Sequence, residues 1–430
     1  MAEKENESKG FPRLLDSVKN KLGSLFSYLE ENYFSLDNFI DIIKTGVGII
    51  HDMDDALTDM QKVSHKSIQS LKAFQKESFN VADTVGTSAL TLQSATADWI
   101  RLGEAMDDAA DSAKASIILL NVSDFESLND AAAALAAVNK VYSELEKIDI
   151  VDVINNIENN YQIAIDELAK GLQDTAAVLK SQGNDLNESV ALLTAGNAIT
   201  EDMSKTSTSV QTISLRLAGT KEAKAQLASL GEDVDDFIFR TQAKTQQLIQ
   251  KYTAVASNAY KGVDVLDANG NLKNTYDILL DIAKVYKEIQ EEDKKTGGNR
   301  SQALVETIAG KNQSNIASGI LLNPQLLEDV YTSALDSAGS AQNELDDYLD
   351  SISGHLTKLQ NQWQSIWVFD DNREFINFFI DLGTGILKVV DNLGILKTAL
   401  IGIAAYAGIN NVGSPKMFGL IICFEIPTVC

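Results

Sequence analysis

Hydrophobic residues along this chain recur mainly at three- and four-residue spacing, the period of an amphipathic α-helix. The spacing runs through segments such as "TADWIRLGEAMDDAADSA" and "TYDILLDIAKVYKEIQEED" (275–293), separated by short breaks at Gly, Asn or Ser. No proline, the strongest helix breaker, occurs between Pro12 and Pro324. The pattern predicts an all-α protein with a multi-helix core of helical hairpins, and not one unbroken coiled coil.

Two of these segments show a similar order of features. In each, an Ala-rich helix precedes a glycine, Gly103 or Gly183, and a polar turn and a second apolar helix follow. An internal duplication would produce this order, and so would any protein built of helical hairpins. In the segment "SDFESLNDAAAALAAVNKVYSEL", Ser123 or Asp124 is the expected N-cap.

One stretch, "GVDVLDANGNLKNTYDIL" (262–279), departs from the helical pattern. Here "VDVL" is typical of a short strand, and "NLK" of the strand that returns after a turn. Asn269 and Gly270 both tolerate the positive φ angles of a tight turn. We therefore expect a small β-hairpin at about 263–273, leading into a helix whose N-cap is Asn274 or Thr275.

The same stretch invites comparison with a calcium-binding loop, because Asp267, Asn269 and Asn271 occupy alternate positions. An EF-hand loop also needs glycine at its sixth position and a bidentate glutamate at its twelfth. Leu272 and Ile278 stand at those two positions. The pattern therefore predicts no calcium site.

Candidate catalytic residues are few. The three histidines, His51, His65 and His355, lie beside no nucleophile and form no H-E-x-x-H pattern, so each is assigned to a helix surface. The two cysteines, Cys423 and Cys430, form neither a disulfide framework nor a metal-binding spacing. No catalytic residue is predicted, and the chain is not expected to be an enzyme.

Phosphate binding is also not predicted. "IAGKNQS" contains Gly310 and Lys311, but a P-loop needs glycine where Val305 stands and Ser or Thr where Asn312 stands. The acidic runs 231–237 and 344–350 are expected to be solvated helix faces or ends. No cofactor-binding residue, metal ligand or cofactor is therefore expected.

The net charge of −25, from 61 acidic and 36 basic residues, argues against binding to nucleic acid through its phosphates. The N-terminal residues "MAEKENESKGFPRLL" lack the apolar stretch of a signal peptide, so we expect synthesis in the cytoplasm. Residues 1–50 are expected to contain two amphipathic helices.

The most apolar part of the chain is a predicted hydrophobic helical segment at 371–410. Its most apolar window, 393–409, contains Lys397 and is shorter than the ~20 residues that a membrane span requires. A buried helix and a membrane-inserting segment both fit this pattern. Residues 411–430 lack helical periodicity and are expected to be an irregular, truncated end.

The order of these segments resembles the conserved core region of phage tail tape measure proteins, of the type found in phages and prophages of Gram-positive bacteria. The resemblance begins at "DDALTDMQKVS" and continues through "ELAKGLQDTAAVLKSQGNDLNESVALLTAGNAI" and "TISLRLAGTKEAKAQLASLGEDVDD". It then includes "GVDVLDANGNLKNTYDILLDIAKVYKEI" and ends at "ALVETIAGKNQSNIASGILLN", covering roughly residues 52–325. "HLTKLQNQWQSIW" also resembles a segment found downstream of that core.

This resemblance implies a structural role in the virion tail, inside the tail tube, in tail assembly and in setting tail length. It implies as partners further copies of the chain, the tail tube protein, tail assembly chaperones, distal tail or baseplate proteins, and the host membrane during DNA ejection. Tape measure proteins are usually much longer chains, so we expect tape-measure sequence to resume in the reading frame after about residue 413.

The sequence predicts a core at 51–325, an acidic helical region at 326–370, and the two C-terminal segments described above. An alternative function is that of a membrane-active helical protein, such as a pore-forming toxin or secreted effector, because of the apolar stretch 379–409. A peptidoglycan hydrolase, a domain sometimes fused to tape measure proteins, lacks the catalytic residues it would need.

Overall fold

A computed structural model describes residues 36–232, 234, 242–255 and 260–368 of the protein. Within these ranges the chain forms seventeen helices and no strand, so the all-α prediction is confirmed. The predicted hydrophobic segment at 371–410 and the irregular end at 411–430 lie outside the described residues, as does most of the predicted N-terminal helix pair. The boundaries predicted at residues 50 and 325 remain predictions.

The chain divides into two compact units. Unit 1 comprises Met1–Asp83, Thr87–Ser94 and His355–Cys430, and unit 2 comprises Thr84–Gly86 and Ala95–Gly354. Four helices contribute to the described part of unit 1, and the last three of them also have residues in unit 2: α3 (Leu36–Ser64), α4 (Ile68–Val85), α5 (Ala89–Arg101) and α19 (Ile352–Val368).

Unit 1 joins residues that are distant in sequence through Asn361 on α19. Its Nδ2 donates to the carbonyl of Phe79 at 2.8 Å and to the carboxylate of Asp83 at 2.6 Å. Its Oδ1 accepts a hydrogen bond from the N–H of Ala89, the first residue of α5, at 2.9 Å. Because Asn361 is 1% exposed, these bonds form within the core, and a segment downstream of residue 350 completes the packing of α4 and α5.

Unit 2 contains the remaining thirteen helices. They are α6 (Met106–Asn121), α7 (Leu128–Val141), α8 (Lys147–Asn160), α9 (Ile165–Ser181), α10 (Leu186–Thr200), α11 (Met203–Ala218), α12 (Lys221–Ser229), α13 (Gln242–Thr253), α14 (Thr275–Thr296), α15 (Arg300–Ala309), α16 (Ser314–Leu322), α17 (Pro324–Leu335) and α18 (Ser340–Asp350).

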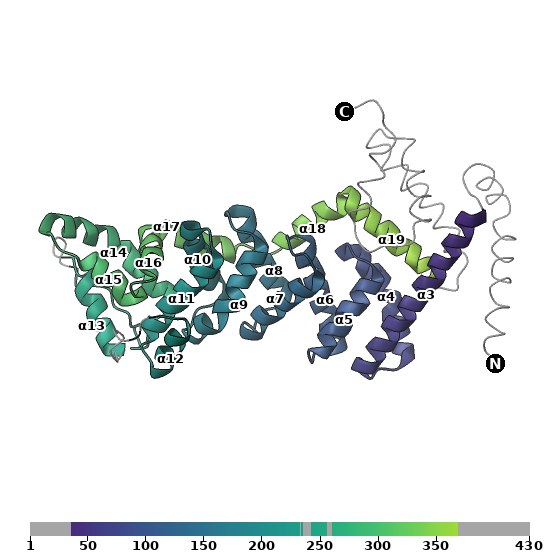
Figure 1. Cartoon of the computed structure of the whole chain (residues 1–430), viewed down its shortest axis with the longest axis horizontal. Helices are drawn as coiled ribbons and strands as arrows, with labels where there is room; N and C mark the ends of the chain where they lie inside the picture. The colour runs from purple at the N-terminus through teal and green to yellow at the C-terminus, as the bar shows by residue number, and fades with distance from the viewer. Residues whose placement is uncertain (1–35, 233, 235–241, 256–259, 369–430) are drawn as a thin grey trace, which may run out of the picture. The chain divides into compact units, whose positions relative to one another are not determined.

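The centre of unit 2 is formed by α9, α10 and α11, which pack against one another. The last helices of unit 2 pack against helices that come earlier in the chain. Helix α16 packs against α14 and α10, α17 against α10 and α8, and α18 against α8 and α6 (Figure 1). We call α17 and α18 with their connection, residues Pro324–Asp350, the strap, because this segment returns across helices that precede it by more than 100 residues.

The two segments that resemble each other in sequence share a helix ending. At the end of α5, the N–H of Glu104 donates to the carbonyl of Trp99, and Gly103 between them has a φ of 104°. At the end of α9, the N–H of Asn184 donates to the carbonyl of Leu179, and Gly183 has a φ of 86°. This six-to-one bond with a left-handed glycine is a common helix terminus. The glycine that the two segments share is therefore the terminus of the first helix in each.

The stretch 263–273 forms a tight turn but no pair of strands. Leu266 and Leu272 make a single antiparallel bridge, and the N–H of Lys273 donates to the carbonyl of Val265 at 2.9 Å. Of the two turn residues, only Gly270 has a positive φ, of 83°. The expected turn with two positive φ angles is therefore wrong, and a three-residue loop that ends on a left-handed glycine takes its place.

Two predicted N-caps have different outcomes. Asn274 caps α14, because its side chain accepts a hydrogen bond from the N–H of Asp277 at 2.7 Å. The cap expected at Ser123 or Asp124 is wrong, since α7 begins at Leu128 and is capped by Ser127. Capping requires an acceptor two or three residues before a free N–H, and Ser127 provides one for Asp130 at 3.2 Å.

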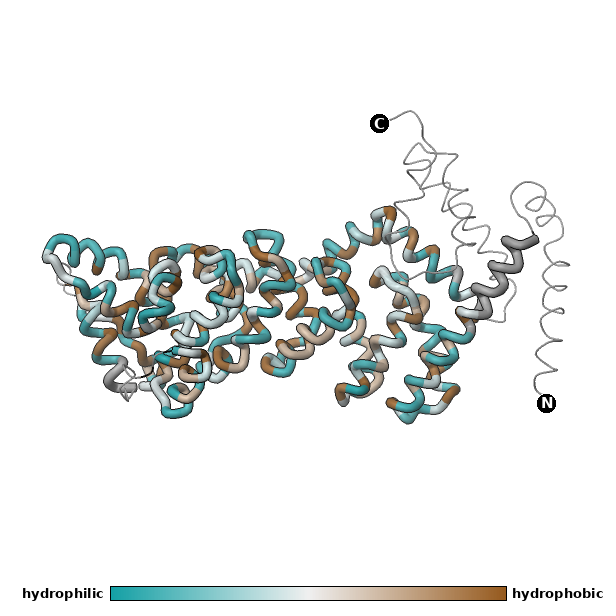
Figure 2. Tube along the Cα trace, in the orientation of Figure 1, coloured by the Kyte–Doolittle hydropathy of each residue, from teal (hydrophilic) through white to brown (hydrophobic). Residues whose placement is uncertain are grey.

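Polar and apolar residues alternate along the described helices (Figure 2). None of these helices is both long enough and apolar enough to cross a membrane. The apolar stretch 379–409, for which membrane insertion was considered, lies outside the described residues.

Candidate functional site

The main polar cluster of unit 2 lies on α8, in the sequence "KIDIVDVINNIENN". Asp152, Asn155, Asn156 and Asn159 are spaced at i, i+3, i+4 and i+7, which places them on one face of the helix. We call these four residues the polar face of α8. Asp152 and Asn155 are buried, although charged and amide side chains are usually exposed. Such burial requires partners, and the strap provides them.

Asp152 caps the N-terminus of α18. Its two carboxylate oxygens accept hydrogen bonds from the N–H of Gly339 at 2.8 Å and of Ala341 at 3.0 Å. The residue at the N-cap position, Gly339, has no side chain that could serve this purpose. A carboxylate at this position also interacts favourably with the positive end of the helix dipole. The aspartate of one helix thus caps another whose N-cap residue, Gly339, lies 187 residues later in the sequence.

The asparagines of this face contact the rest of the strap. Asn155 donates to the carboxylate of Glu344 at 2.5 Å and accepts from the hydroxyl of Ser340 at 2.6 Å. Asn159 donates to the same Glu344 oxygen at 3.1 Å. Asn156 donates to the carbonyl oxygen of Ser333, at the end of α17, at 2.7 Å. The polar face of α8 therefore fixes both helices of the strap.

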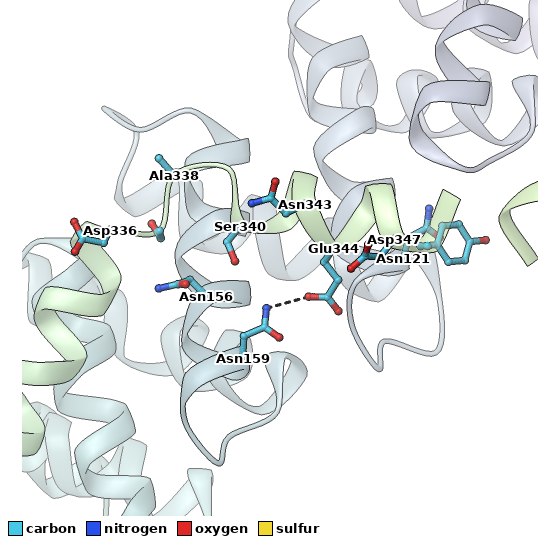
Figure 3. Close-up of a pocket in the computed structure, with 11 residues that line it drawn as sticks. Asn121, Asn156, Asn159, Asp336, Ala338, Ser340, Asn343, Glu344 and Asp347 are labelled. Atoms are coloured by element: carbon cyan, nitrogen blue, oxygen red, sulfur yellow. Dashed lines mark hydrogen bonds between the residues drawn. The ribbon is translucent and has the colours of Figure 1, made fainter. Parts of the chain in front are cut away.

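A pocket of about 690 Å³ lies between this face, the end of α6 and the strap (Figure 3). Eleven residues line it: Asn121, Asn156, Asn159, Asp336, Ser337, Ala338, Ser340, Asn343, Glu344, Asp347 and Tyr348. Three of them are carboxylates, and none is Lys, Arg or His. The pocket is therefore an acceptor-rich, negatively charged site.

The electrostatics around the pocket agree with this charge. Burial, together with the negative charges of Glu344 and Asp124, raises the pKa of Glu158 on α8. The acidic run 344–350 was expected to be solvated, and Asp346, Asp347 and Asp350 are indeed exposed. Glu344 differs, because it is half-buried and bound to two asparagines.

A second polar cluster connects the turn before α10 with the start of α14. The side-chain oxygen of Asn184 accepts from the N–H of Tyr276 at 3.0 Å, and Asn274 donates to Glu188 at 2.8 Å. Burial is the main cause of a raised pKa at Glu188, and the nearby charge of Asp185 adds to it. The stretch that follows the 263–273 turn is thus anchored to a helix hairpin about 90 residues earlier.

The residues considered for calcium form a turn. The carboxylate of Asp267 accepts hydrogen bonds from the N–H groups of Asn271 and Asn269, both at 2.8 Å. These bonds hold the pKa of Asp267 below its usual value. Its oxygens therefore stabilise the loop.

The remaining candidates are scattered. Gly310 and Lys311 connect α15 to α16, and the backbone of Gly310 lies against the guanidinium of Arg216. His51 is exposed on α3, with its Nδ1 3.2 Å from Asp55, and His355 is exposed on α19. His65 was also assigned to a helix surface, but it lies in the connection between α3 and α4. The structure does not bring these residues together.

The sequence interpretation missed the polar face of α8. Its signal is visible in "IVDVINN", where an aspartate and an asparagine interrupt positions that would otherwise extend the apolar face. Their partners lie 177–189 residues later in the sequence. The spacing of apolar residues within one helix does not indicate which distant segment that helix contacts.

The polar clusters described above form helix caps and contacts between helices. The family of phage-related minor tail proteins matches residues 75–305, just over half of the chain. The chain belongs to this family, which implies a location in the phage tail. The match confirms the resemblance to phage tail proteins. No solved structure matches the chain.

Proposed function

We propose that this chain is a tail tape measure protein, which lies within the tail tube during assembly and sets the length of the tail. The observation that carries the proposal is the family match over residues 75–305. The ordered segments of residues 52–325, which resemble the conserved tape-measure core, support the finer assignment. We propose that its role is structural and not enzymatic.

The helical architecture suits a molecular ruler. An α-helix rises ~1.5 Å per residue, so the 430 residues would span at most about 650 Å if the whole chain were one helix. The described residues already form helices over most of their length. Changes in the number of residues would then change the extended length in proportion.

A ruler is extended, whereas unit 2 is folded back on itself by the strap. We therefore propose that the compact form exists before the chain enters the tube, or outside it, and that the chain extends inside. Such a transition requires a core that opens readily. The composition of α11, at the centre of unit 2, supports this requirement.

Helix α11 buries hydroxyl groups where a stable core would place apolar groups. Ser207, Ser209 and Thr212 are buried among α9, α10 and their neighbours, and their hydroxyls have no hydrogen-bond partner among the described residues. Thr194 and Asn197 on α10 each have a buried oxygen in the same condition. A buried polar group without a partner costs about 1–3 kcal/mol. Transfer of α11 to water would remove this cost.

The proposal includes partners. We propose that the chain associates with further copies of itself, with the tail tube protein, with tail assembly chaperones and with distal tail or baseplate proteins. We also propose contact with the host membrane during DNA ejection. The net charge of −25 supports an absence of nucleic acid from this set of partners.

Insertions of graded length test the proposal. Gly297 and Gly298 are exposed between α14 and α15, a position where additional residues disturb few contacts. We would insert two or four alanine-rich helical heptads there in the phage that carries the gene, and measure the tails by electron microscopy. The expected increases are about 20 Å and about 40 Å.

A matched control inserts the same numbers of residues into the tail tube protein gene, which should leave tail length unchanged. Complete tails of unchanged length with both inserts in this chain would refute the tape measure role. A family member with another role in the tail would give that result.

A further inference from the structure

Helix α19 differs from the strap in the kind of side chain that it buries. Helix α18 buries three apolar residues, Ala341, Leu345 and Leu349. Among the side chains of α19 that the structure describes, only Asn361 and Gln364 are buried, and both are amides. The attachment of α19 to unit 1 therefore depends more on hydrogen bonds and less on apolar contact than the attachment of α18 does.

The two buried amides are not equally satisfied. Asn361 bonds to Phe79, Asp83 and Ala89, as described above. Gln364, one turn later, has a buried Oε1 with no hydrogen-bond partner among the described residues. Water would supply that partner, because a carbonyl oxygen exposed to solvent is hydrogen-bonded. One residue thus holds α19 in place, and a neighbouring residue favours its release.

The connection before α19 is very short. Ser351 is the single residue between α18 and α19, and its backbone is extended, with φ −73° and ψ 166°. Its hydroxyl accepts a hydrogen bond from the N–H of Gly354 at 3.2 Å, which caps the first turn of α19. Because only one residue is non-helical, a change in its backbone conformation is enough to join the two helices into one.

Gly354 is required by the shape of this connection. A Cβ at this position would lie 2.7 Å from the Cα of Leu349 and closer still to the carbonyl oxygen of Tyr348. Both atoms belong to the backbone, so they cannot move aside as a flexible side chain can. In one continuous helix, residues 349 and 354 are more than a turn apart, and the close approach disappears.

The end of α18 itself is firmly packed. A Cβ at Gly86 would lie 2.6 Å from Cε1 of Tyr348, so this ring lies directly against the backbone between α4 and α5. Leu349, the next residue, is buried. A movement of α19 would therefore begin after these two residues, at Ser351.

We propose that Ser351–Gly354 is a two-state joint that controls whether α19 closes unit 1. In the closed form the joint is bent, and Asn361 holds α19 against α4 and α5. In the open form the joint straightens, α18 and α19 become one helix from Ser340 to Val368, and α19 leaves unit 1. The N–H of Ala89 then bonds to water in place of Asn361.

The joint rests only on the contacts of α18 and α19 given above. Its use as an early step of chain extension rests on the proposed tape measure role. Tail length in the phage tests that role, whereas the experiment below tests the joint in the purified chain. Either can therefore fail without the other.

The experiment measures a distance across the joint by double electron–electron resonance. Spin labels are attached to the full chain through Gln342→Cys on α18 and Gln362→Cys on α19, both at exposed positions, with Cys423 and Cys430 replaced by serine. In one continuous helix the labelled positions, 20 residues apart in sequence, are about 30 Å apart. A bent joint gives a shorter distance. We expect a major population at the shorter distance and a minor one at about 30 Å.

Three variants should increase the ratio of the open form to the closed form. Gly354→Ala should increase it at least fivefold, because its methyl group clashes only in the bent joint. Ser351→Ala should increase it about fivefold, because the closed form loses the cap of α19. Asn361→Ala, which leaves the joint itself unchanged, should also increase it, because the closed form loses the bonds to α4 and α5.

The matched control is Gly48→Ala. Gly48 is an exposed glycine within α3, and a Cβ there would have no atom within 4 Å. This variant makes the same chemical change in a helix without a clash, so its ratio should equal that of the natural chain. Thermal unfolding of each variant checks that unit 2 remains folded.

Three results would overturn the proposal. An equal ratio in Gly354→Ala and Gly48→Ala would show that the close approach at Gly354 does not control the joint. A broad distribution of distances without a component at about 30 Å would show that α19 unravels and does not join α18. An unchanged ratio in Asn361→Ala would show that this residue does not hold the closed form.

Discussion

Substitution of Asp152 by alanine tests how the strap is held. The change removes two carboxylate oxygens that accept from the N–H groups of Gly339 and Ala341. Alanine provides no acceptor, and Gly339 has no side chain with which to cap α18. Both N–H groups would therefore lose their partners in a part-buried location.

The size of the effect follows from two estimates. A hydrogen bond to a charged group contributes about 1.5–3 kcal/mol, and replacement of a helix N-cap by alanine costs about 0.5–2 kcal/mol. These figures describe overlapping interactions, so we expect a loss of about 2–4 kcal/mol. In a domain of 150–250 residues, each kcal/mol lowers Tm by about 2–4 °C. Unit 2 is slightly larger than this, and the expected fall in Tm is about 5–10 °C.

The assay combines thermal unfolding of the full chain with limited proteolysis. Because the lost bonds lie at the start of α18, cleavage should appear first in the connection between α17 and α18. Asp111→Ala is the matched control, since Asp111 is an exposed aspartate whose one ion pair, with Lys114, is also on the surface. It should change stability by less than about 0.5 kcal/mol. A Tm for Asp152→Ala equal to that of this control would refute the account of the strap.

Three further predictions concern other parts of the chain. Asn361→Ala should destabilise unit 1 by about 2–3 kcal/mol, because the buried N–H of Ala89 and the carbonyl of Phe79 lose their hydrogen bonds to Asn361. Urea unfolding measures this loss, and a loss below about 0.5 kcal/mol would contradict the prediction. The combined variant Ser207→Ala, Ser209→Ala and Thr212→Val should raise stability by about 1–3 kcal/mol, because it removes buried hydroxyls that have no hydrogen-bond partner among the described residues. A Tm lower than that of the natural chain would show that these hydroxyls do form hydrogen bonds. Glu188→Gln should reduce the dependence of stability on pH. The raised pKa of Glu188 means that the folded state binds its proton more tightly than the unfolded state does, so stability falls as pH rises from 4.5, the usual pKa of a glutamate, through the folded pKa. Unfolding curves at pH 4.5 and pH 7 that differ equally in both proteins would contradict this assignment.

Local patterns in the sequence were sufficient to predict the helices. Apolar spacing identified α14 together with its N-cap, because Asn274 and the helix that it caps are adjacent in sequence. The cap of α7 was placed too early, because Ser123, Asp124 and Ser127 are all good capping residues and periodicity does not choose among them. The alanine-rich run that follows gives no apolar and polar contrast that would mark the first turn.

The turn at 263–273 shows a different limit. An Asn-Gly pair favours a turn with two positive φ angles, but Asp267 competes by accepting from two backbone N–H groups ahead of it. This side chain favours a longer loop, in which only Gly270 needs a positive φ. The rule for the dipeptide was correct about the presence of a turn and wrong about its type.

The polar face of α8 could not be assigned a function from sequence, because its meaning depends on the strap. This dependence also bears on extension. When α18 leaves, Asp152, Asn155 and Asn159 exchange their hydrogen bonds to it for bonds with water, so each lost bond costs only about 0.5–1.5 kcal/mol net. An apolar face of similar size would hold α18 more strongly, because exposing apolar surface to water costs about 25 cal/mol for each Å². Apolar residues such as Leu345 and Leu349 still hold α18 in place. Unit 2 therefore combines apolar contacts that hold α18 with polar contacts that break at low cost, and the proposed extension of the chain requires both.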